Sequence, residues 1–196
     1  MKFLKFLLVI FISLTSSVKA DLNKNLIDQL QEGGKLIFIR HAYAPGSGDP
    51  INFNLNDCSS QRNLDKNGKE QAKKIGNFFK EKKIPIQKVI SSQWCRCKET
   101  ALIAFSNYQI KSFLNSFYSK KYSKNREPQI EELKLFIKKW DRKKNLILIT
   151  HYVVISEILN YAPSSGEIVV SDTNFELIGS ISVSYTHLTL PTICSV

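Results

Sequence analysis

The sequence predicts a three-layer α/β/α domain in which helices cover both faces of a mostly parallel central sheet. Short apolar runs such as Lys35–Arg40 and Asn145–Thr150 have the composition of strands that are buried on both faces. Amphipathic stretches such as Lys66–Lys82 and Ile130–Trp140 carry apolar residues at helical spacing. Strands that alternate with helices favour this arrangement, and no internal repeat or linker divides residues 21–182, so one domain is expected.

The first half of the chain is predicted to begin with a helix over Leu22–Leu30, which ends at two glycines before the first strand. Residues Ala44–Asn63 are rich in Gly, Pro, Asn and Asp, which is typical of a long loop. Asp65 can cap a helix that begins at Lys66 and turns its apolar stripe inward. A second short strand is predicted over Lys88–Ser91.

The second half is predicted to continue the alternation, with a polar and basic excursion over Phe117–Glu127. Pro128 stands where a helix begins, and Asp172–Asn174 are expected to join the last two strands. The other predicted elements are the helices Trp94–Phe105 and Val153–Leu159 and the strands Ile110–Leu114, Glu167–Val170 and Phe175–Ile181.

Residues Met1–Ala20 have the features of a secretory signal peptide. Lys2 and Lys5 precede the apolar run Phe6–Leu14, and Val18–Ala20 places small residues at the cleavage positions. The alternative is an uncleaved membrane anchor, but the run is about half of the ~20 residues that a span needs. We therefore expect cleavage, with no stable membrane span afterwards, and a periplasmic or secreted protein.

The segment Val183–Val196 contains no Lys, Arg, Asp or Glu, although 23% of the whole chain is charged. Residues Val183–Thr192 resemble a translated sequencing-library adapter, the alternative being a genuine final strand. A non-native tail is the expectation, and residues 183–196 carry no functional inference.

The formal net charge of +11 favours acidic partners, which include phosphorylated small molecules, anionic lipid surfaces and nucleic acid. The lysines are spread along amphipathic stretches, as on solvated helix faces, and no motif of RNA or DNA binding is present. A phosphorylated small molecule, or a phosphorylated glycan or lipid of the cell envelope, is the expected partner, and nucleic acid is not.

Reactive side chains follow three of the predicted strands. Arg40 and His41 lie at the end of the first strand, two serines and Arg96 follow the second, and His151 comes directly after Thr150. Ligands of such sheets bind outside the carboxyl ends of the strands, so these groups should converge on one edge. Outside the tail, His41 and His151 are the only histidines.

This combination is suited to phosphoryl transfer. An imidazole nucleophile presents one neutral nitrogen while a hydrogen bond holds the other, and a strand-to-loop turn offers backbone carbonyls for that bond. The transferred group carries charge on its oxygens, so Arg40 and Arg96 are predicted to clamp it and a protonated His151 to add a donor. A neighbouring guanidinium should also keep His41 unprotonated at neutral pH.

Four segments, in order, resemble the motifs of the histidine phosphatase superfamily, which includes the phosphoglycerate mutases. The resemblance implies a phosphoglycerate-mutase-like fold, a phosphohistidine at His41 that water hydrolyses, and a phosphoryl group held by Arg40, Arg96 and His151. It implies no metal and no cofactor. The segments are Leu36–His41, Arg62–Ala72, Ser91–Ala101 and Ile147–His151.

The chain departs from the family pattern at two turns and in its general acid. Ala42 stands where the family usually has glycine, and Tyr152 follows the second histidine. Asn115 lies near the place of the expected acid, so Asp49 and Asp57 in the long loop are the candidate proton donors. Their alternative role is that of turn-forming residues.

Arg62 has two possible roles, contact with an anionic group of the substrate or a salt bridge that pins the loop. A basic rim for a large anionic substrate is one reading of the excursion, and a solvated loop is the other. That rim would consist of Lys120, Lys121, Lys124 and Arg126.

The three cysteines outside the tail predict a disulfide, because exported chains reach an oxidising compartment. Cys95 and Cys97 point to different sides of a helix, so only one is expected to pair with Cys58, and Cys95 is predicted.

The predicted function is therefore a phosphatase that hydrolyses phosphomonoesters in the cell envelope, with a phosphorylated envelope sugar as one substrate that the compartment suggests. Two alternatives stay open: a catalytically weak member of the fold that binds phosphorylated ligands, and a mutase.

Overall fold

The computed structural model describes residues 24–184. The predicted signal peptide and residues 185–196 of the predicted tail lie outside them. A helix over residues 24–32 precedes the first strand. The strands are β1 (Leu36–Arg40), β2 (Ile86–Ser91), β3 (Gln109–Ile110), β4 (Asn145–Thr150), β5 (Ile168–Ser171) and β6 (Leu177–Ile181). The longer helices that follow are α2 (Lys66–Glu81), α3 (Cys95–Phe105), α4 (Arg126–Lys138) and α5 (Tyr152–Leu159).

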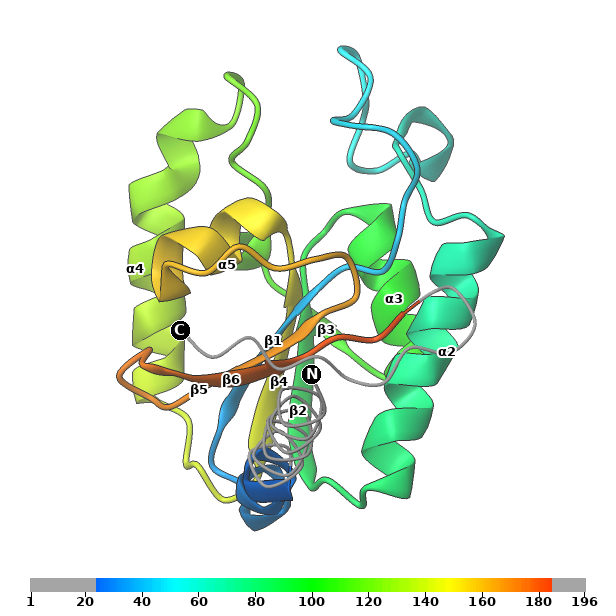
Figure 1. Cartoon of the computed structure of the whole chain (residues 1–196). Helices are drawn as coiled ribbons and strands as arrows, with labels where there is room; N and C mark the ends of the chain where they lie inside the picture. The colour runs from blue at the N-terminus through cyan, green and yellow to red at the C-terminus, as the bar shows by residue number, and fades with distance from the viewer. Residues whose placement is uncertain (1–23, 185–196) are drawn as a thin grey trace, which may run out of the picture.

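The six strands form one sheet in the order β3-β2-β4-β1-β5-β6 (Figure 1). Strands β1 to β4 pair in parallel, whereas β5 runs antiparallel to β1 and β6 antiparallel to β5. The prediction of a mostly parallel central sheet is confirmed.

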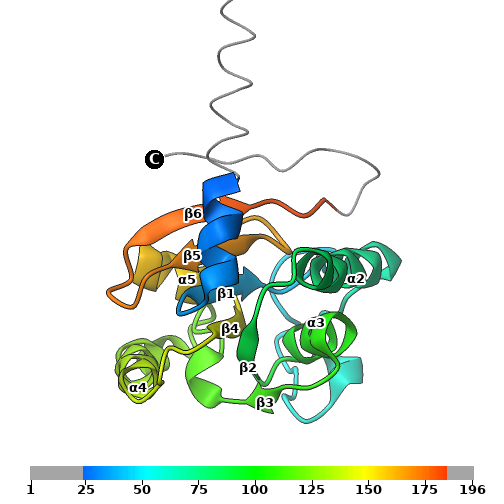
Figure 2. The ribbon, with the colours of Figure 1, turned by 90° about the horizontal axis from the view of Figure 1, so that it is seen from below.

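Helices cover both faces of this sheet. Figure 2 shows α2 and α3 on one side and α4 and α5 on the other. Leu30 of the first helix packs with Ile75 of α2 and Ile147 of the sheet, while Leu133 of α4 packs with Leu148 on the opposite face. The three-layer prediction is confirmed. None of the described helices is long and apolar enough to cross a membrane.

Helix α2 begins where the sequence predicts, because the Asp65 carboxylate accepts a hydrogen bond from the Gly68 backbone N–H at 2.8 Å. Its buried side carries Ile75 and Phe79. A Cβ atom at Gly76 would collide with the backbone carbonyl of Ala104 in α3. A glycine at this position therefore lets α2 and α3 pack closely.

The strand predicted over Ile110–Leu114 is largely wrong. Strand β3 contains only Gln109 and Ile110, both exposed at the sheet edge, and a 3-10 helix over Ser112–Leu114 follows. Phe113 and Leu114 turn into the core against α4, where the Leu114 carbonyl accepts a hydrogen bond from Thr150 Oγ1 at 2.6 Å. The free energy gained by burying these two apolar side chains outweighs that of further backbone hydrogen bonds at the edge of the sheet.

Buried Gln71 in α2 joins three segments that lie far apart in the sequence. Its Oε1 accepts a hydrogen bond from the Tyr43 backbone N–H, and its Nε2 donates to the carbonyls of Ser165 and Val183. The loop that follows His41 is thereby tied to α2. Val183 and Ser184 are the part of the predicted tail that the structure describes.

Candidate active site

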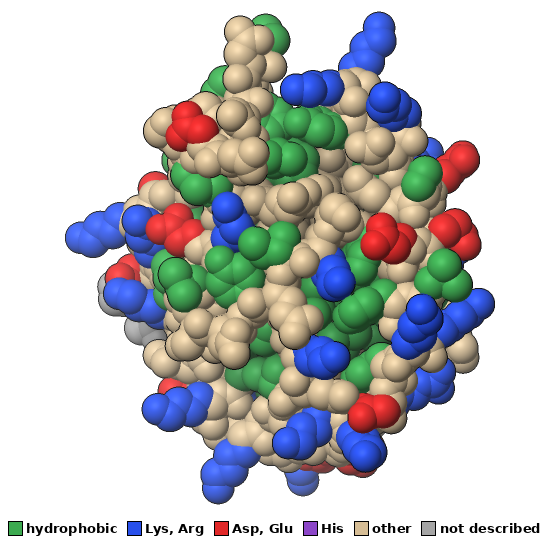
Figure 3. All heavy atoms as spheres, turned by 180° about the vertical axis from the view of Figure 1, so that it is seen from behind, with side chains coloured by type: hydrophobic (Ala, Val, Ile, Leu, Met, Phe, Trp, Pro, Cys, Tyr) green, Lys and Arg blue, Asp and Glu red, His purple; other side chains and the backbone are tan. Residues whose placement is uncertain are grey.

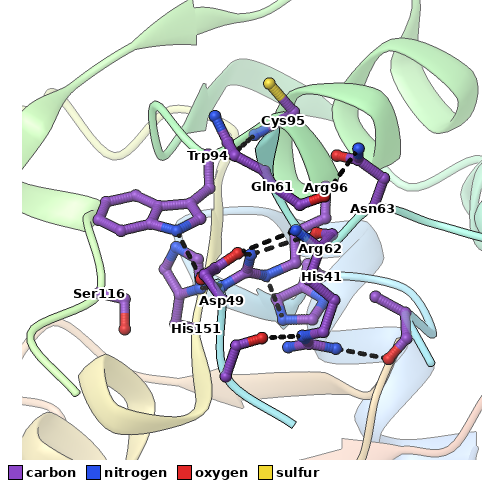
Figure 4. Close-up of polar contacts among 12 residues, drawn as sticks. His41, Asp49, Gln61, Arg62, Asn63, Trp94, Cys95, Arg96, Ser116 and His151 are labelled. Carbon is purple, nitrogen blue, oxygen red and sulfur yellow. Dashed lines mark hydrogen bonds and ion pairs between the residues drawn. The ribbon is translucent and has the colours of Figure 1, made fainter. Parts of the chain in front are cut away.

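The carboxyl ends of β1, β2 and β4 bring the predicted residues to one edge of the sheet. Arg40 pairs with Thr150 in the parallel register, and the His41 backbone N–H donates to the Thr150 carbonyl at 2.9 Å. The two histidines that follow these strands therefore lie side by side, with ring centroids 5.5 Å apart. Arg96, in the first turn of α3, lies within hydrogen-bonding distance of both rings (Figure 4).

His41 is buried and held in one tautomer. Its Nδ1 lies 2.8 Å from the Ala42 carbonyl, to which only an N–H can bond, and its Nε2 accepts a hydrogen bond from Arg96 Nε at 3.1 Å. Burial, and after it the charge of Arg96, hold the pKa of His41 well below its ordinary value. The ring is therefore neutral at pH 7, with the lone pair of Nε2 facing the guanidinium. Ala42 does not adopt a positive φ, so alanine is accommodated at this turn.

His151 is also buried and neutral. Its Nε2 lies 2.9 Å from Ser92 Oγ, which itself donates to Asn115 Oδ1 at 3.1 Å. The hydrogen therefore lies on Nε2, and Nδ1 faces Arg96 Nη2 at 3.4 Å. Burial, followed by the charge of Arg96, holds the pKa of His151 well below its ordinary value. Asn115, near the position where the resemblance led us to look for an acid, thus orients Ser92.

The Asp49 carboxylate lies on Arg96 in the middle of the site. It accepts hydrogen bonds from Arg96 Nη1 at 2.8 Å and Nη2 at 3.1 Å, and from Trp94 Nε1 at 3.0 Å. Burial raises the pKa of Asp49, but the hydrogen bonds and charge of Arg96 outweigh it, so the pKa lies below its ordinary value. In this arrangement Asp49 is an ionised anion on the guanidinium that was predicted to clamp phosphate, and not a proton donor.

Asp57 does not face the site, which corrects its assignment as a second candidate acid. The residue is exposed and caps a short 3-10 helix over Cys58–Ser60. Its carboxylate accepts hydrogen bonds from the backbone and hydroxyl of Ser59. Asp57 therefore has the alternative role of a turn-forming residue, because these local donors hold its side chain on the outer side of the loop.

One nitrogen of the Arg40 guanidinium is buried without a hydrogen-bond partner among the described residues. Its Nη1 donates to the Pro163 carbonyl at 2.9 Å, while its buried Nε has no hydrogen-bond partner within residues 24–184. The Tyr152 ring lies against the guanidinium, with its centroid 5.6 Å from Cζ. Burial lowers the pKa of Arg40, yet arginine stays cationic at neutral pH.

Arg62 combines parts of both roles that the sequence left open. It pins the loop, but through the carbonyls of Gly48 and Ala44 and not through a salt bridge. Its side chain also lines the pocket that contains the two histidines. Burial lowers the pKa of Arg62, which remains a cation at neutral pH.

The structure has a disulfide between Cys58 and Cys95, whose Cα atoms are 5.6 Å apart, so the pairing predicted from the sequence is present. It ties the long loop to the first turn of α3, next to Arg96. Cys97 is a buried free thiol 3.5 Å from His151 Nε2. Burial raises the pKa of Cys97 to about 12, so the thiol is protonated and unreactive at neutral pH.

A cavity of about 520 Å³ lies over the two histidines. Trp94 forms part of its wall and was not anticipated, although an aromatic residue between a strand end and Arg96 is a usable signal. Its ring packs edge-on against His151 at 5.1 Å. Within residues 24–184, no group of three or more His, Cys, Asp or Glu side chains could hold a metal ion.

A sequence model described as the histidine phosphatase superfamily (branch 1) matches residues 36–146, more than half of the chain. The chain belongs to this superfamily. The match includes His41, Arg62 and Arg96 and ends before His151, whose place in the site follows from the β1–β4 register. A search of curated protein sequences found no match.

Several solved structures with phosphatase or mutase descriptions are similar in fold. One is the protein histidine phosphatase SixA complexed with tungstate, with 15% identity and a TM-score of 0.52 over 77% of this chain and 97% of that one. The alpha-ribazole phosphatase from Shigella flexneri has 16% identity and a TM-score of 0.53, over 70% and 90%. Phosphoglycerate mutase from Thermus thermophilus has 14% identity and a TM-score of 0.51, over 76% and 99%. At these identities the likeness shows the fold, as the sequence predicted.

The two buried histidines should make the fold sensitive to acid. In the unfolded chain each imidazole binds a proton as the pH falls through about 6.5, whereas the folded protein keeps both rings neutral. The stability that the two neutral rings contribute to the folded protein is fully present above about pH 6.5. It is lost as the pH falls from there toward the lowered pKa values of the folded protein. Between about pH 7.5 and 5.5 we expect the free energy of unfolding to fall by about 1 kcal/mol for each histidine, as measured by urea denaturation.

A variant that carries both His41→Asn and His151→Asn is the matched control. It removes the two groups that titrate, so its free energy of unfolding should change less over the same interval. An equal change in the variant and in the unmodified chain would contradict the assignment of buried, neutral rings.

Proposed function

We propose that this member of the superfamily is a phosphatase that hydrolyses phosphomonoesters through a phosphohistidine at His41. One observation carries the proposal: the unprotonated Nε2 of His41 faces the guanidinium of Arg96 at 3.1 Å, while Nδ1 is held by the Ala42 carbonyl. A nucleophilic imidazole requires this combination of a free nitrogen and a fixed one. A phosphoryl group bound to Arg96 would therefore meet the lone pair.

Substrate binding in this proposal exchanges one anion for another. The phosphoryl group displaces the Asp49 carboxylate from Arg96 and binds beside the Arg40 guanidinium, which lines the same pocket. The charge of the bound dianion raises the pKa of His151, which becomes a third donor once it is protonated. Arg62 adds positive charge from the loop. Catalysis then rests on positioning and charge, as phosphoryl transfer requires.

The reaction has two steps. His41 Nε2 forms a bond to phosphorus as the bond to the leaving oxygen breaks, and the Arg96 Nε–H turns from His41 to a phosphoryl oxygen. Water then attacks phosphorus and gives up a proton to the Asp49 carboxylate, the P–N bond breaks, and phosphate leaves with His41 restored. Displacement from Arg96 removes contacts that lower the pKa of Asp49, and the nearby phosphoryl dianion favours the neutral carboxyl group. Asp49 that has then taken up a proton from solvent is the candidate donor of that proton to the leaving oxygen.

Trapping of the phosphoenzyme tests this function. The full chain is mixed with 4-nitrophenyl phosphate, quenched in alkali, and analysed by peptide mass spectrometry. We expect an acid-labile phosphoryl group on His41 and a burst of nitrophenol equal to the enzyme concentration when dephosphorylation is the slower step. Hydrolysis accompanied by a phosphoryl group on another residue would overturn the proposed nucleophile.

A phosphate-binding protein without turnover is the second candidate. It is favoured by one observation: among the described residues that line the pocket, Asp49 carries the only carboxyl group, and it is ionised and paired. An aryl phosphate separates the two candidates, because its leaving group needs little protonation. Binding of tungstate without hydrolysis of 4-nitrophenyl phosphate would support this second candidate.

The proposal extends to the cell envelope as the place of action, with a phosphorylated small molecule, glycan or lipid as substrate. The features of the leader and the disulfide between Cys58 and Cys95 support it, because such bonds form and persist in oxidising compartments. Fractionation of cells that express the full chain tests this part. Recovery in the cytoplasm with both cysteines open to alkylation would contradict it.

A further inference from the structure

The pocket over the histidines extends well beyond the reach of a phosphoryl group. Two loops, residues 46–51 and residues 116–121, supply much of its lining on opposite sides of the sheet edge (Figure 1). We call them the pocket loops. A cavity of about 520 Å³ is within the range that holds a whole small molecule. The chain therefore has room for the leaving group of a substrate as well as for its phosphate.

Exposed apolar and aromatic side chains gather at this pocket. Within residues 24–184, six large hydrophobic side chains are exposed, and Ile51, Tyr118 and Tyr152 among them line this one cavity. Tyr118 is 71% exposed and Tyr152 is 43% exposed. Figure 3 shows hydrophobic side chains in the hollow between the two projections at one end of the molecule. Rings left open to solvent beside a ligand site offer flat apolar surface to a ring of the ligand.

Positive charge at the pocket falls into two separate groups. Arg40, Arg62 and Arg96 lie in the inner part, where the phosphoryl group would bind. Lys120 and Lys121 line the pocket from the second pocket loop, and neither has an ion pair with a described carboxylate. Lys121 Nζ lies over the Tyr122 ring, 5.4 Å from its centroid, and this contact leaves its charge unneutralised. Since the phosphoryl group occupies the arginines, the charges of the two lysines can serve a second anionic group.

The structure shows which of the four basic residues that the sequence suggested as a rim line the pocket. Arg126 is paired with Glu157 at 2.7 Å, and neither Arg126 nor Lys124 lines the cavity. The rim at the pocket therefore consists of Lys120 and Lys121.

We infer that the substrate is a phosphomonoester whose leaving group contains a ring and carries a second anionic group. The phosphoryl group binds at the arginines, the ring packs against Tyr118 and Tyr152, and the second anion meets Lys120 and Lys121. This inference rests on the proposed function, because it takes the inner arginines as the phosphoryl site.

Binding of three phosphonates, which the enzyme cannot hydrolyse, tests the inference without turnover. They are methylphosphonate, phenylphosphonate and 4-carboxyphenylphosphonate, each titrated calorimetrically into the full chain. We expect phenylphosphonate to bind about tenfold more tightly than methylphosphonate, because the ring buries apolar surface. The carboxylate should add about a further fivefold at low salt, and added salt should reduce this gain by screening.

Two variants assign each gain to its residues. Tyr118→Ala should reduce the preference for phenylphosphonate over methylphosphonate, and the double variant Lys120→Ala, Lys121→Ala should remove the gain from the carboxylate. Lys124→Ala is the matched control, since it removes a lysine of the same region that does not line the pocket. It should leave both ratios unchanged.

Each failure has a separate meaning. Equal affinities for the three phosphonates would overturn the inferred substrate class and leave the phosphoryl site intact. A carboxylate gain that survives in the double lysine variant would overturn the role of the two lysines. Absence of binding for all three would overturn both this inference and the proposed function.

Discussion

Replacement of His41 by asparagine is expected to lower kcat for 4-nitrophenyl phosphate by about 1000-fold or more, because an amide has no basic nitrogen to attack phosphorus. The asparagine amide can still donate to the Ala42 carbonyl that now accepts from Nδ1, so the turn after β1 should keep its shape. What it lacks is the basic nitrogen that faces Arg96. Stopped-flow measurement of nitrophenol release, in both burst and steady state, checks this expectation.

His151→Asn is the matched variant for this experiment. In our proposal His151 donates to the phosphoryl group and does not bond to phosphorus, so its loss should lower kcat by about 100-fold and leave the phosphoenzyme detectable. Activity of His41→Asn equal to that of the unmodified chain would refute a nucleophilic His41. A phosphoryl adduct lost equally in both variants would refute the division of roles between the two rings.

Removal of the disulfide between Cys58 and Cys95 is expected to lower the free energy of unfolding substantially. The bond joins residues 37 positions apart. In the chain-entropy account, a cross-link that closes a loop of this length lowers the conformational entropy of the unfolded chain, which raises its free energy by about 4 kcal/mol. The double variant Cys58→Ser, Cys95→Ser should therefore unfold at a lower urea concentration, with a free energy of unfolding reduced by about that amount.

The same variant should also weaken the site. Gln61 Oε1 accepts a hydrogen bond from the Cys95 backbone N–H, and the neighbouring Arg62 pins the loop that carries Asp49. A loop freed at Cys58 would hold this arrangement less firmly, so kcat/KM should fall. Cys97→Ala is the control for loss of a thiol without loss of the bond. If it destabilises the chain as much as the double variant, cross-linking is not the source of the stability.

The buried strands of the fold were predictable from local pattern. Strands such as β1 and β4 are continuous apolar runs, and the cap at Asp65 places the start of α2. The prediction fails at β3, where Phe113 and Leu114 leave the sheet for the core of the α4 face. A segment as short as Ile110–Leu114 carries no periodicity that separates the two settings, so only packing decides between them.

The site could be predicted in the part that lies at strand ends. His41, Arg96 and His151 follow buried strands or begin the next helix, and parallel strands end at a common edge. Asp49 could not be placed in this way, because it lies in an irregular loop without periodic signal. Its place on Arg96 follows from tertiary contacts of the loop, in which the Arg62 backbone N–H donates to Asp49 and the Arg62 side chain donates to the Gly48 carbonyl.

By itself, the sequence determined the alternation of strands and helices, the two histidines at strand ends, and the arginines that accompany them. Burial and backbone pairing act over a few residues, so apolar runs and caps encode these features locally. Only the tertiary structure decided which carboxylate lies on Arg96 and how Tyr118 and Lys120 line the pocket. Those contacts join loops through side chains that lie far apart in the chain, and the path of each loop is set by the partners it meets after folding.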